Sequence, residues 1–565
     1  MRNFLILLIL LIFSVHVARG QNACARQKQC KIRVIGDSWA QFPYVYHAYD
    51  TALAKYGFAD YYAIGDATAL IGMQAEVWWQ FPLARFALEA ALNTDAARPI
   101  ELVMVSLGGN DAAFGVHATD SLSVLDDNLA NSKLFMDSIF DFVHEKIPNA
   151  HIIWQGYDYP NFVDALLNYP WNPYRDLWES RGEPTPFMVN RVVDYMMQHM
   201  DTTVQGYHRV GKNYIHYFNC MGLMQWLYGQ TTPLRVAPFG TYPPHSVPFP
   251  GGDWNYPTPY IAMGLNGLET YHLGPMGYTE LCNFYMRAYI NAYFRRNKSA
   301  SVYSMGTIYD GAVNTNGNIS TGSVVVSNNG VSKNKGIFSF NTEFIPDNYR
   351  VKKASLFIKN KSIQNRYTNY WNPFPDNFVL EIKKGAFGSS AVEAGDFNEP
   401  SDYFDAACVV GCLQGNDYSL RFDLNDNALA FINKLGLTQF RLSINDTNVI
   451  TFYNGDTTAF EGPYLDLYYD TTTVTSIKNN TLESIPFSIF PTVSRDYIKL
   501  ALPTNLPDEK MTISIITLDG KVAENLPLSA VKLNTIDISK LPAAEYLVQV
   551  KSSDKMYISR FIKPD

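Results

Sequence analysis

The sequence predicts a multidomain protein that begins with an α/β domain built on a parallel sheet and continues with two antiparallel β domains. The chain has 565 residues, more than one hydrophobic core usually serves, so about two to four domains are expected. Up to residue 297, short apolar strands alternate with amphipathic helices, which favours a parallel sheet covered on both faces. Beyond residue 298, short β-like runs alternate with Asn, Gly, Ser and Asp turns, as in an antiparallel sandwich.

Each element of the first domain has its own signal. Buried strands bounded by Gly or polar turns are expected at residues 31–35, 61–64, 101–106 and 151–155. Apolar residues at helical spacing predict helices over 122–146 and 277–295, and an amphipathic segment covers 40–55. Residues 157–268 are crowded with Pro, Trp and Tyr, and we interpret much of this stretch as long loops around a site. The aromatic residues would serve an ordinary core equally well.

The later regions follow in order. The predicted middle domain, residues 298–470, contains β-like runs at 323–326, 336–340, 354–358, 378–382, 439–444 and 464–469. A polar stretch, residues 471–487, has the composition of a linker. A third β pattern then covers 488–565 and includes a hairpin signal over 515–522, with Asp519 and Gly520 at the turn.

Composition excludes two classes of protein. Hydrophobic residues make up 47% of the chain and charged residues 17%, which is enough to order several cores and excludes a disordered chain. Lys and Arg total 45 and Asp and Glu 53, giving a net charge of −8 with no basic block. Because nucleic-acid binding needs a positively charged stripe, nucleic acid is not an expected partner.

The N-terminus predicts export. Arg2 precedes an apolar run over residues 4–13, and the small residues Ala18 and Gly20 follow. This is typical of a signal peptide, residues 1–20, cleaved near Gly20. The alternative is a membrane anchor, but ten apolar residues are too few to span roughly 30 Å of hydrocarbon. No transmembrane helix is expected elsewhere.

Six cysteines remain after that cleavage, an even number that suggests disulfides in an exported protein. Six cysteines allow 15 connectivities, and their clustering along the chain favours Cys24–Cys30, Cys220–Cys282 and Cys408–Cys412. Neither Cys nor His shows zinc spacing, so no metal and no cofactor are predicted.

The first chemical motif follows the first strand. Gly36-Asp37-Ser38 places a serine between a strand end and a helix N-terminus, where free backbone N–H groups and the helix dipole stabilise negative charge. Ser38 is thus a candidate nucleophile, and the competing interpretation is a serine N-cap beside an Asp turn.

Two more motifs follow strands that would lie near the first. Gly108-Gly109-Asn110-Asp111 comes directly after residues 101–106, so the Asn110 amide can aim at a substrate oxygen, although a plain Gly-Asn turn is the simpler explanation. Gly65 closes residues 61–64 and could present its backbone N–H to the same point.

The last motif carries the candidate base. Glu269 stands three residues before His272, just before the final amphipathic helix. This spacing lets the carboxylate reach the imidazole Nδ1, leaving Nε2 to accept the serine proton. A lone histidine in such a loop is more often structural, but with the other motifs it completes a catalytic set.

This ordered set resembles the SGNH/GDSL hydrolase family. The resemblance covers about residues 31–297 and implies a flavodoxin-like α/β/α domain, predicted as residues 21–297, without a cofactor. It implies that Ser38 is the nucleophile, that His272 is the base and that Glu269 orients it. Ser38, Gly65 and Asn110 would form the oxyanion hole. The family usually has Asp where Glu269 stands and often Pro where Leu273 stands, so Asp253 remains an alternative orienting residue.

Two weaker resemblances concern the rest of the chain. Residues 298–470 are similar to DNRLRE-like β-sandwich modules of secreted enzymes, which act as spacers or bind glycans. Residues 488–565 resemble the C-terminal sorting domain of type IX secretion in Bacteroidetes, with Ala544 where Gly is usual. This implies the type IX secretion machinery as a partner, and a protein that is secreted or attached to the outer membrane surface.

The sequence therefore predicts a secreted carboxylic ester hydrolase that acts through an acyl-enzyme. The possible sugar stacking of Trp171, Trp178 and Trp254 favours deacylation of a polysaccharide. The same aromatic residues, with Met196 and Met197, could instead line the acyl pocket of a lipolytic esterase. A third hypothesis is a surface adhesin with an inert hydrolase domain, in which residues 298–470 bind glycans.

Overall fold

The computed structural model describes residues 28–113, 117, 119–169, 171–172, 174–265, 269–364, 378–411, 413–445, 447–457, 461–470, 488–490, 493–501, 512–517, 521–527, 533–551 and 556–564. The predicted signal peptide and linker lie outside these residues. The chain divides into two compact units, residues 1–472 and 473–565. The predicted first and middle domains therefore belong to one unit.

The first unit contains the expected parallel sheet, with strands in the order β2-β1-β3-β4-β5. This order is that of flavodoxin-like doubly wound sheets, in which ligands bind at the carboxyl ends of the strands where the order reverses. Here that point lies between β1 and β3. The strands are β1 (Gln29–Gly36), β2 (Tyr61–Ile64), β3 (Leu102–Ser106), β4 (His151–Trp154) and β5 (Ile215–Tyr217).

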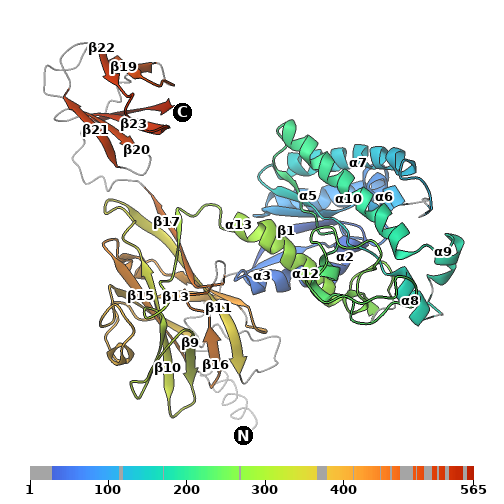
Figure 1. Cartoon of the computed structure of the whole chain (residues 1–565), viewed down its shortest axis with the longest axis horizontal. Coiled ribbons are helices and arrows are strands. Elements are labelled where there is room, and N and C mark those ends of the chain that lie inside the picture. Colours follow the sequence, from blue (N-terminus) through green and yellow to red (C-terminus); the bar gives the residue numbers. More distant parts are fainter. Residues whose placement is uncertain are drawn as a thin grey trace, which may run out of the picture. The chain divides into compact units, whose positions relative to one another are not determined.

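Helices cover the sheet in two groups. Helices α2, α3 and α12 pack against one another, and α4, α5, α7 and α10 form a second packed group; Figure 1 shows α3 and α12 on one side and α5, α7 and α10 on the other. Their bounds are α2 (Ser38–Val45), α3 (Ala48–Lys55), α4 (Ala75–Gln80), α5 (Pro82–Ala96), α6 (Gly109–Ala113), α7 (Val124–Lys146), α10 (Pro186–Arg209) and α12 (Pro275–Tyr285). A π-helical turn, Met286–Ile290, joins α12 to α13 (Asn291–Phe294).

The interpretation of residues 157–268 as mostly loops is wrong in part. The described residues of this stretch contain strand β5 and four α-helices, α8 (Phe162–Asn168), α9 (Arg175–Ser180), the 24-residue α10 and α11 (Leu223–Tyr228). Pro186 occupies the first turn of α10, and the Thr185 side chain accepts the Met188 N–H. Proline at the first helical position supports a helix, so the composition that suggested a loop here marks a helix start.

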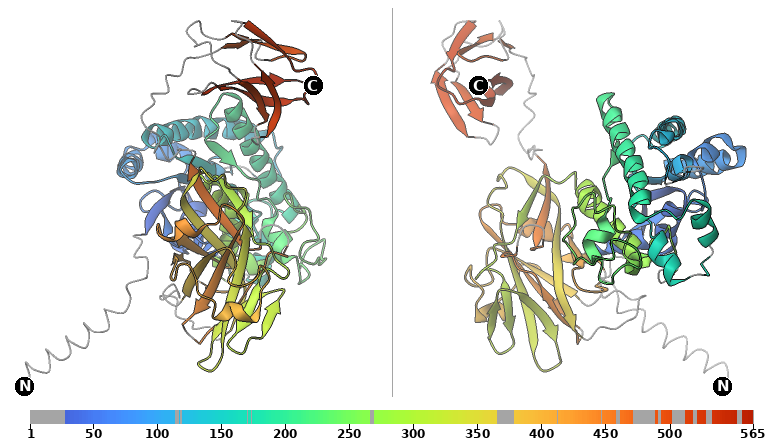
Figure 2. Two further views of the ribbon diagram at one scale, coloured as in Figure 1. Left: turned by 90° about the vertical axis from the view of Figure 1, so that its left-hand side faces the viewer. Right: turned by 45° about the vertical axis from the view of Figure 1, so that its right-hand side comes forward.

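The remainder of the first unit is the middle β region, β6 to β17, a twelve-stranded antiparallel assembly whose long strands run side by side in Figure 2. Each of the predicted runs lies in one of its strands. These are β6 (Ala300–Tyr303), β7 (Gly311–Asn314), β8 (Ile319–Thr321), β9 (Val324–Asn328), β10 (Lys333–Asn341), β11 (Arg350–Gln364), β12 (Phe378–Lys384), β13 (Ala407–Val410), β14 (Ser419–Leu424), β15 (Leu437–Ile444), β16 (Val449–Phe452) and β17 (Tyr464–Asp470). The similarity to DNRLRE-like modules stays a prediction.

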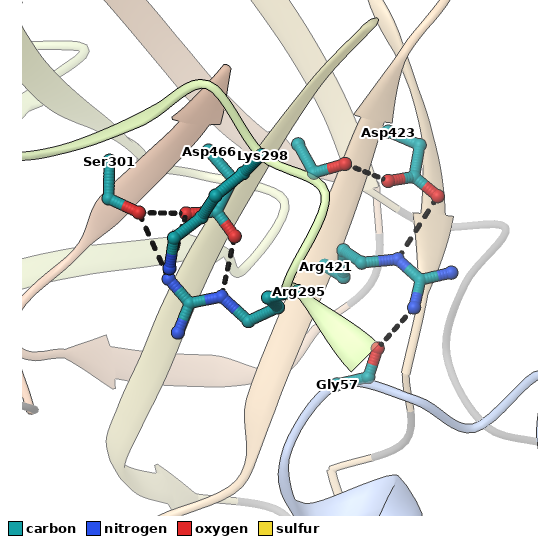
Figure 3. A network of polar contacts seen from close by, with 8 residues as sticks. Gly57, Arg295, Lys298, Ser301, Arg421, Asp423 and Asp466 are labelled. Carbon is teal, nitrogen blue, oxygen red and sulfur yellow. Dashed lines mark hydrogen bonds and ion pairs between the residues drawn. The ribbon is translucent and has the colours of Figure 1, made fainter. Parts of the chain in front are cut away.

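The middle β region contacts the α/β domain through buried charges. Arg421 on β14 donates to the Gly57 carbonyl at 3.0 Å and to Asp423 at 3.0 Å, as Figure 3 shows, and also to Asp60 at 2.7 Å. Arg295 forms a two-point ion pair with Asp466 on β17. The Phe357 ring of β11 is part of the α/β core. The two regions therefore have separate cores that meet at a contact containing buried charges and Phe357.

The second unit consists of two small antiparallel sheets around a core of Ile, Leu, Val and aromatic side chains. Strands β20 and β21 pair antiparallel, which confirms the predicted hairpin, although Asp519 and Gly520 lie outside the described residues. The strands are β18 (Ser488–Phe490), β19 (Tyr497–Ala501), β20 (Thr512–Thr517), β21 (Val522–Pro527), β22 (Leu533–Asp537), β23 (Ala544–Lys551) and β24 (Met556–Lys563).

Among the described residues, none of the helices is long and apolar enough to cross a membrane.

The predicted disulfide pairing is wrong for the α/β domain. Cys30, Cys220 and Cys282 are free and buried, and burial raises the pKa of Cys30 to about 11. The Cys220 thiol lies 3.7 Å from the Tyr157 carbonyl, to which it donates. Cys408 is disulfide-bonded, but its predicted partner Cys412 lies outside the described residues, as does Cys24, so the Cys408–Cys412 pairing stays a prediction.

Candidate active site

The turn that carries Ser38 is shaped by its glycine and its cap. Gly36 has φ +151°, and a Cβ there would lie 2.1 Å from the Ser106 carbonyl oxygen of the neighbouring strand, so only glycine fits. Asp37 caps α2 by accepting the Trp39 N–H at 2.9 Å. Ser38 is therefore the first residue of the helix, where the backbone N–H has no intrahelical acceptor.

His272 lies near the C-terminal end of the α/β domain in the sequence, and in the fold it contacts Ser38. Its Nε2 lies 2.7 Å from Ser38 Oγ, although 234 positions separate the two residues. Its Nδ1 faces Glu269, with 3.2 Å between Nδ1 and Oε1. The carboxylate lies off the line of an ideal hydrogen bond to the ring, as is common for catalytic pairs before substrate binds. One hydroxyl, one imidazole and one carboxylate thus form a continuous chain.

Glu269 is held ionised beside the histidine. Burial alone would raise the pKa of its carboxyl group, but the nearby His272 ring and the N–H groups of Tyr271 and Thr270 outweigh burial, so its pKa is lowered. The same oxygen, Oε1, accepts those two N–H groups at 3.0 and 2.9 Å. Asp253, the alternative orienting residue, instead binds Asn255 through its carboxylate. The geometry favours Glu269.

Asn110 lies beside Ser38 at the wall of one cavity. It follows β3 at the start of α6, and one N–H of its side chain donates to the Met73 carbonyl at 3.0 Å. An amide has two such donors, and the second is suited to a substrate oxygen. Gly109 lets Tyr157 approach closely, since a Cβ there would lie 2.5 Å from the Tyr157 ring.

Gly65 does not line this cavity, and Gly72 does. Gly65 instead lies against the Tyr44 ring, which a Cβ at Gly65 would approach to 3.0 Å. Gly72 has φ +74° and open space where a Cβ would project. Both glycines follow β2. The sequence signal that could have pointed to Gly72 is that it is a second glycine, a few residues after Gly65. The cavity lining thus includes Ser38, Asn110 and His272 of the predicted site residues, and the role of Gly65 stays a prediction.

A buried hydrogen-bond network next to Ser38 was not predicted from the sequence. Asp37 accepts the Tyr157 hydroxyl at 2.6 Å and the Ser106 hydroxyl at 3.3 Å, and the Tyr157 oxygen accepts the Gly109 N–H at 3.2 Å. Tyr157 thus joins the turn that carries Ser38 to the turn that carries Asn110. Burial is the main cause that raises the pKa of Asp37 to about 6, against the opposing effect of these hydrogen bonds.

The cavity beside Ser38 and His272 has a volume of about 510 Å³. Of the three tryptophans considered for sugar stacking, Trp178 lines it, and Trp171 and Trp254 do not. Met196 lines it, but Met197 lies in the protein core. In the part of the chain that the structure describes, no group of three or more His, Cys, Asp or Glu side chains could hold a metal ion.

Comparison with known sequences identifies the C-terminal region. Residues 488–564 match the family of secretion system C-terminal sorting domains. This segment is a sorting domain. The protein is therefore secreted or held at the cell surface, and the type IX secretion machinery is involved in its export. A search of curated proteins found no match.

Several solved structures are similar to this chain over a little less than half of its length. A carbohydrate acetylesterase from Sinorhizobium meliloti is 13% identical with a TM-score of 0.25, over 46% of this chain and 98% of that one. The periplasmic domain of a lipopolysaccharide acetyltransferase from Salmonella ser. Paratyphi A is 15% identical with a TM-score of 0.26, over 47% and 85%. A protein described as a GDSL-like lipase from Parabacteroides merdae is 12% identical with a TM-score of 0.23, over 47% and 98%. Similarity this low carries no conclusion about activity.

Proposed function

We propose that the protein is a secreted serine ester hydrolase that acts through an acyl-enzyme. The observation that carries this proposal is the chain of contacts from Ser38 Oγ to His272 Nε2 at 2.7 Å and from His272 Nδ1 to Glu269 at 3.2 Å. Ser38 and His272 line a cavity that is large enough for a substrate. Serine, histidine and an orienting carboxylate in this order are the parts of nucleophilic acyl transfer.

In the proposed reaction, Ser38 Oγ attacks the ester carbonyl carbon while its proton passes to His272 Nε2. The carbonyl oxygen becomes an oxyanion, for which we assign three donors: the Ser38 N–H, the Gly72 N–H in place of the predicted Gly65, and the Asn110 side chain. The tetrahedral intermediate then collapses, and His272 returns its proton to the departing alcohol. Water deprotonated by His272 attacks the acyl-enzyme, which releases the acid and restores Ser38.

Glu269 has a positioning role in this scheme. Because Nε2 must be free to accept the serine proton, the neutral imidazole has to carry its own proton on Nδ1. The ionised Glu269 carboxylate favours that tautomer and stabilises the imidazolium that forms during attack. Its pKa is lowered in the folded protein, which keeps the carboxylate charged at neutral pH.

Two substrate classes remain candidates. Deacylation of a polysaccharide was favoured by three tryptophans, of which only Trp178 lines the cavity, and its indole N–H donates to the Pro184 carbonyl at 3.2 Å. The lipolytic alternative is supported by the mainly apolar lining, which includes Met196. The adhesin hypothesis predicts instead that the full-length Ser38→Ala protein binds glycans and that wild-type protein hydrolyses no ester.

The decisive test is hydrolysis of p-nitrophenyl acetate and butyrate by the wild-type protein and by Ser38→Ala. We expect Ser38→Ala to lose at least a thousandfold in kcat, since removal of a triad member typically costs much more. A fluorophosphonate probe should label wild-type protein and spare Ser38→Ala. Ser138→Ala, on α7 outside the cavity lining, is the matched control and should keep wild-type rates. Equal rates for wild type and Ser38→Ala would refute the proposal.

A further inference from the structure

The cavity next to Ser38 is much larger than a short acyl group. Its volume is about 510 Å³, on the order of seventeen times the roughly 30 Å³ that one water occupies in the liquid. An acetyl group has only three non-hydrogen atoms. If the acyl group were acetyl, it would fill only the part of the cavity next to Ser38, and solvent would fill most of the rest.

One part of the cavity wall is an apolar helix face. Val189, Val192, Val193 and Met196 of α10 all line it. Their spacing, i, i+3, i+4 and i+7, places them in one stripe along the first turns of the helix. Met196 belongs to the α/β core and the three valines pack against core side chains, and the same stripe also borders the cavity.

Aromatic side chains extend the apolar wall. Phe162 of α8 and Trp178 of α9 line the cavity and are buried, and they pack together with Tyr271. The Phe162 and Tyr271 rings meet edge to face, with centroids 4.5 Å apart. Ile71, at the same cavity near Gly72, is 62% exposed. Apolar surface thus extends around the space that a substrate would fill.

Two polar groups that line the cavity, Asp158 and Tyr174, are already engaged within the protein. The buried Asp158 carboxylate accepts the N–H groups of Tyr159, Gly222 and Met224 at 2.8 to 2.9 Å. The Tyr174 hydroxyl donates to Glu269 at 3.3 Å. Recognition of sugar hydroxyls needs donors and acceptors that the wall can offer to a ligand, whereas burial of apolar carbon needs none.

From these observations we propose that the cavity is the acyl-binding site for a medium-length hydrophobic acyl chain. The α10 stripe and the aromatic wall of Phe162 and Trp178 hold the chain away from water. This inference rests on the proposed esterase function and adds its substrate class: esters of medium-length fatty acids rather than acetate esters of glycans.

The first test is the dependence of kcat/KM on acyl length with the alcohol kept constant. The probes are p-nitrophenyl acetate, butyrate, hexanoate and octanoate, each below its solubility limit. Each methylene buried in the cavity should raise kcat/KM about fourfold, from about 0.8 kcal/mol per methylene, so octanoate should exceed butyrate on the order of a hundredfold. A maximum at acetate, or faster release of acetate from acetylated xylan than of octanoate, would overturn the proposal.

Arg181 also lines the cavity. Because its side chain is positively charged, a further test asks whether the site prefers an anionic acyl group. The hemisuccinate and the butyrate of p-nitrophenol have acyl chains of equal length, and only the hemisuccinate carries a free carboxylate. We expect butyrate to react faster. A preference for the hemisuccinate would show that the site selects anionic acyl groups and would overturn the assignment to fatty acids.

The second test fills the cavity. Val193→Trp should lower the ratio of octanoate to acetate kcat/KM at least tenfold. Val210→Trp is the matched control, because Val210 caps the same helix and is 74% exposed outside the cavity lining; it should leave the ratio unchanged. Val189→Phe adds less volume to the same stripe and replaces Val193→Trp if thermal unfolding shows that variant to be misfolded. An unchanged ratio in a folded variant overturns the proposal.

The two levels of the proposal fail in different ways. If no ester is hydrolysed in a Ser38-dependent manner, the esterase function itself fails. If acetate is hydrolysed in a Ser38-dependent manner and longer chains bring no gain, the esterase function stands and the acyl-chain assignment is overturned.

Discussion

Asp37, directly below the proposed nucleophile, makes the stability of the fold depend on pH in an unusual direction. It is 1% exposed, and burial raises the pKa of its carboxyl group from 3.8 to about 6 in the folded protein. A carboxyl group whose pKa is raised by folding stabilises the folded state fully below its unfolded pKa. That contribution is lost as pH rises through the folded value.

The size of this effect follows from the shift. One pKa unit corresponds to about 1.4 kcal/mol, so a shift of about two units corresponds to about 3 kcal/mol in total, of which about 2 kcal/mol falls between pH 4.5 and pH 7. Asp37→Asn removes the titration. The free energy of unfolding of Asp37→Asn, relative to wild type, should therefore rise by about 2 kcal/mol over that range. Lost hydrogen bonds add an offset that is the same at every pH.

The assay is urea unfolding followed by tryptophan fluorescence at about pH 3, 4.5, 5.5 and 7, for wild type, Asp37→Asn and Glu269→Gln. Glu269→Gln is the control of opposite sign, since the pKa of Glu269 is lowered by folding. Its carboxylate stabilises the folded state above the unfolded pKa. The free energy of unfolding of wild type should therefore increase relative to that of Glu269→Gln as pH rises from about 3 to 5. A difference between wild type and Asp37→Asn that is constant with pH would refute the reasoning about Asp37.

Three further substitutions test the site and the fold. Asn110→Ala should lower kcat on a p-nitrophenyl ester about a hundredfold or more, through loss of an oxyanion donor, with the circular dichroism spectrum unchanged. Tyr157→Phe removes the hydroxyl that links Asp37 to the Gly109 N–H; steady-state kinetics should show kcat about tenfold lower with KM little changed, whereas a purely structural role would leave kcat of the folded fraction intact. Arg421→Met should lower the urea-derived free energy of unfolding by about 3 to 5 kcal/mol, and Lys352→Met, at an exposed ion pair with 48% of the lysine side chain accessible, by less than about 1 kcal/mol.

Local signals were enough to predict four of the strands of the sheet, but not β5, and the contact between Ser38 and His272 was predicted from the ordered set of motifs rather than from either motif alone. An apolar strand followed by Gly36-Asp37-Ser38 carries its own strand, turn and helix start, and the same holds for β3 and Gly108-Gly109-Asn110. Parallel strands end at one edge of a sheet, so motifs that follow β1 and β3 come together without further information. The pairing of Glu269 with His272 is also local, because three residues separate them.

Contacts between distant segments could not be predicted in this way. The bond between Tyr157 and Asp37 joins residues 120 positions apart, and nothing near either residue indicates the other. The choice between Gly65 and Gly72 depends on the path of the chain after β2. Cysteines close in sequence were expected to pair, but a disulfide needs specific Cβ geometry, and an even number of cysteines does not supply it.

The middle β region is best understood as part of the same folded body as the α/β domain. Arg421 and Asp60 are 4% and 7% exposed, and separating the two regions would deprive Asp60 of its cation, although Arg421 would keep its contact with Asp423. Removing one partner of a buried pair typically costs several kcal/mol, because the remaining charge is left uncompensated. Separation would also expose Phe357, which is now 3% exposed in the α/β core. An adhesin that works through an independently mobile β domain would have to break these contacts, whereas an esterase with a rigid accessory region keeps them.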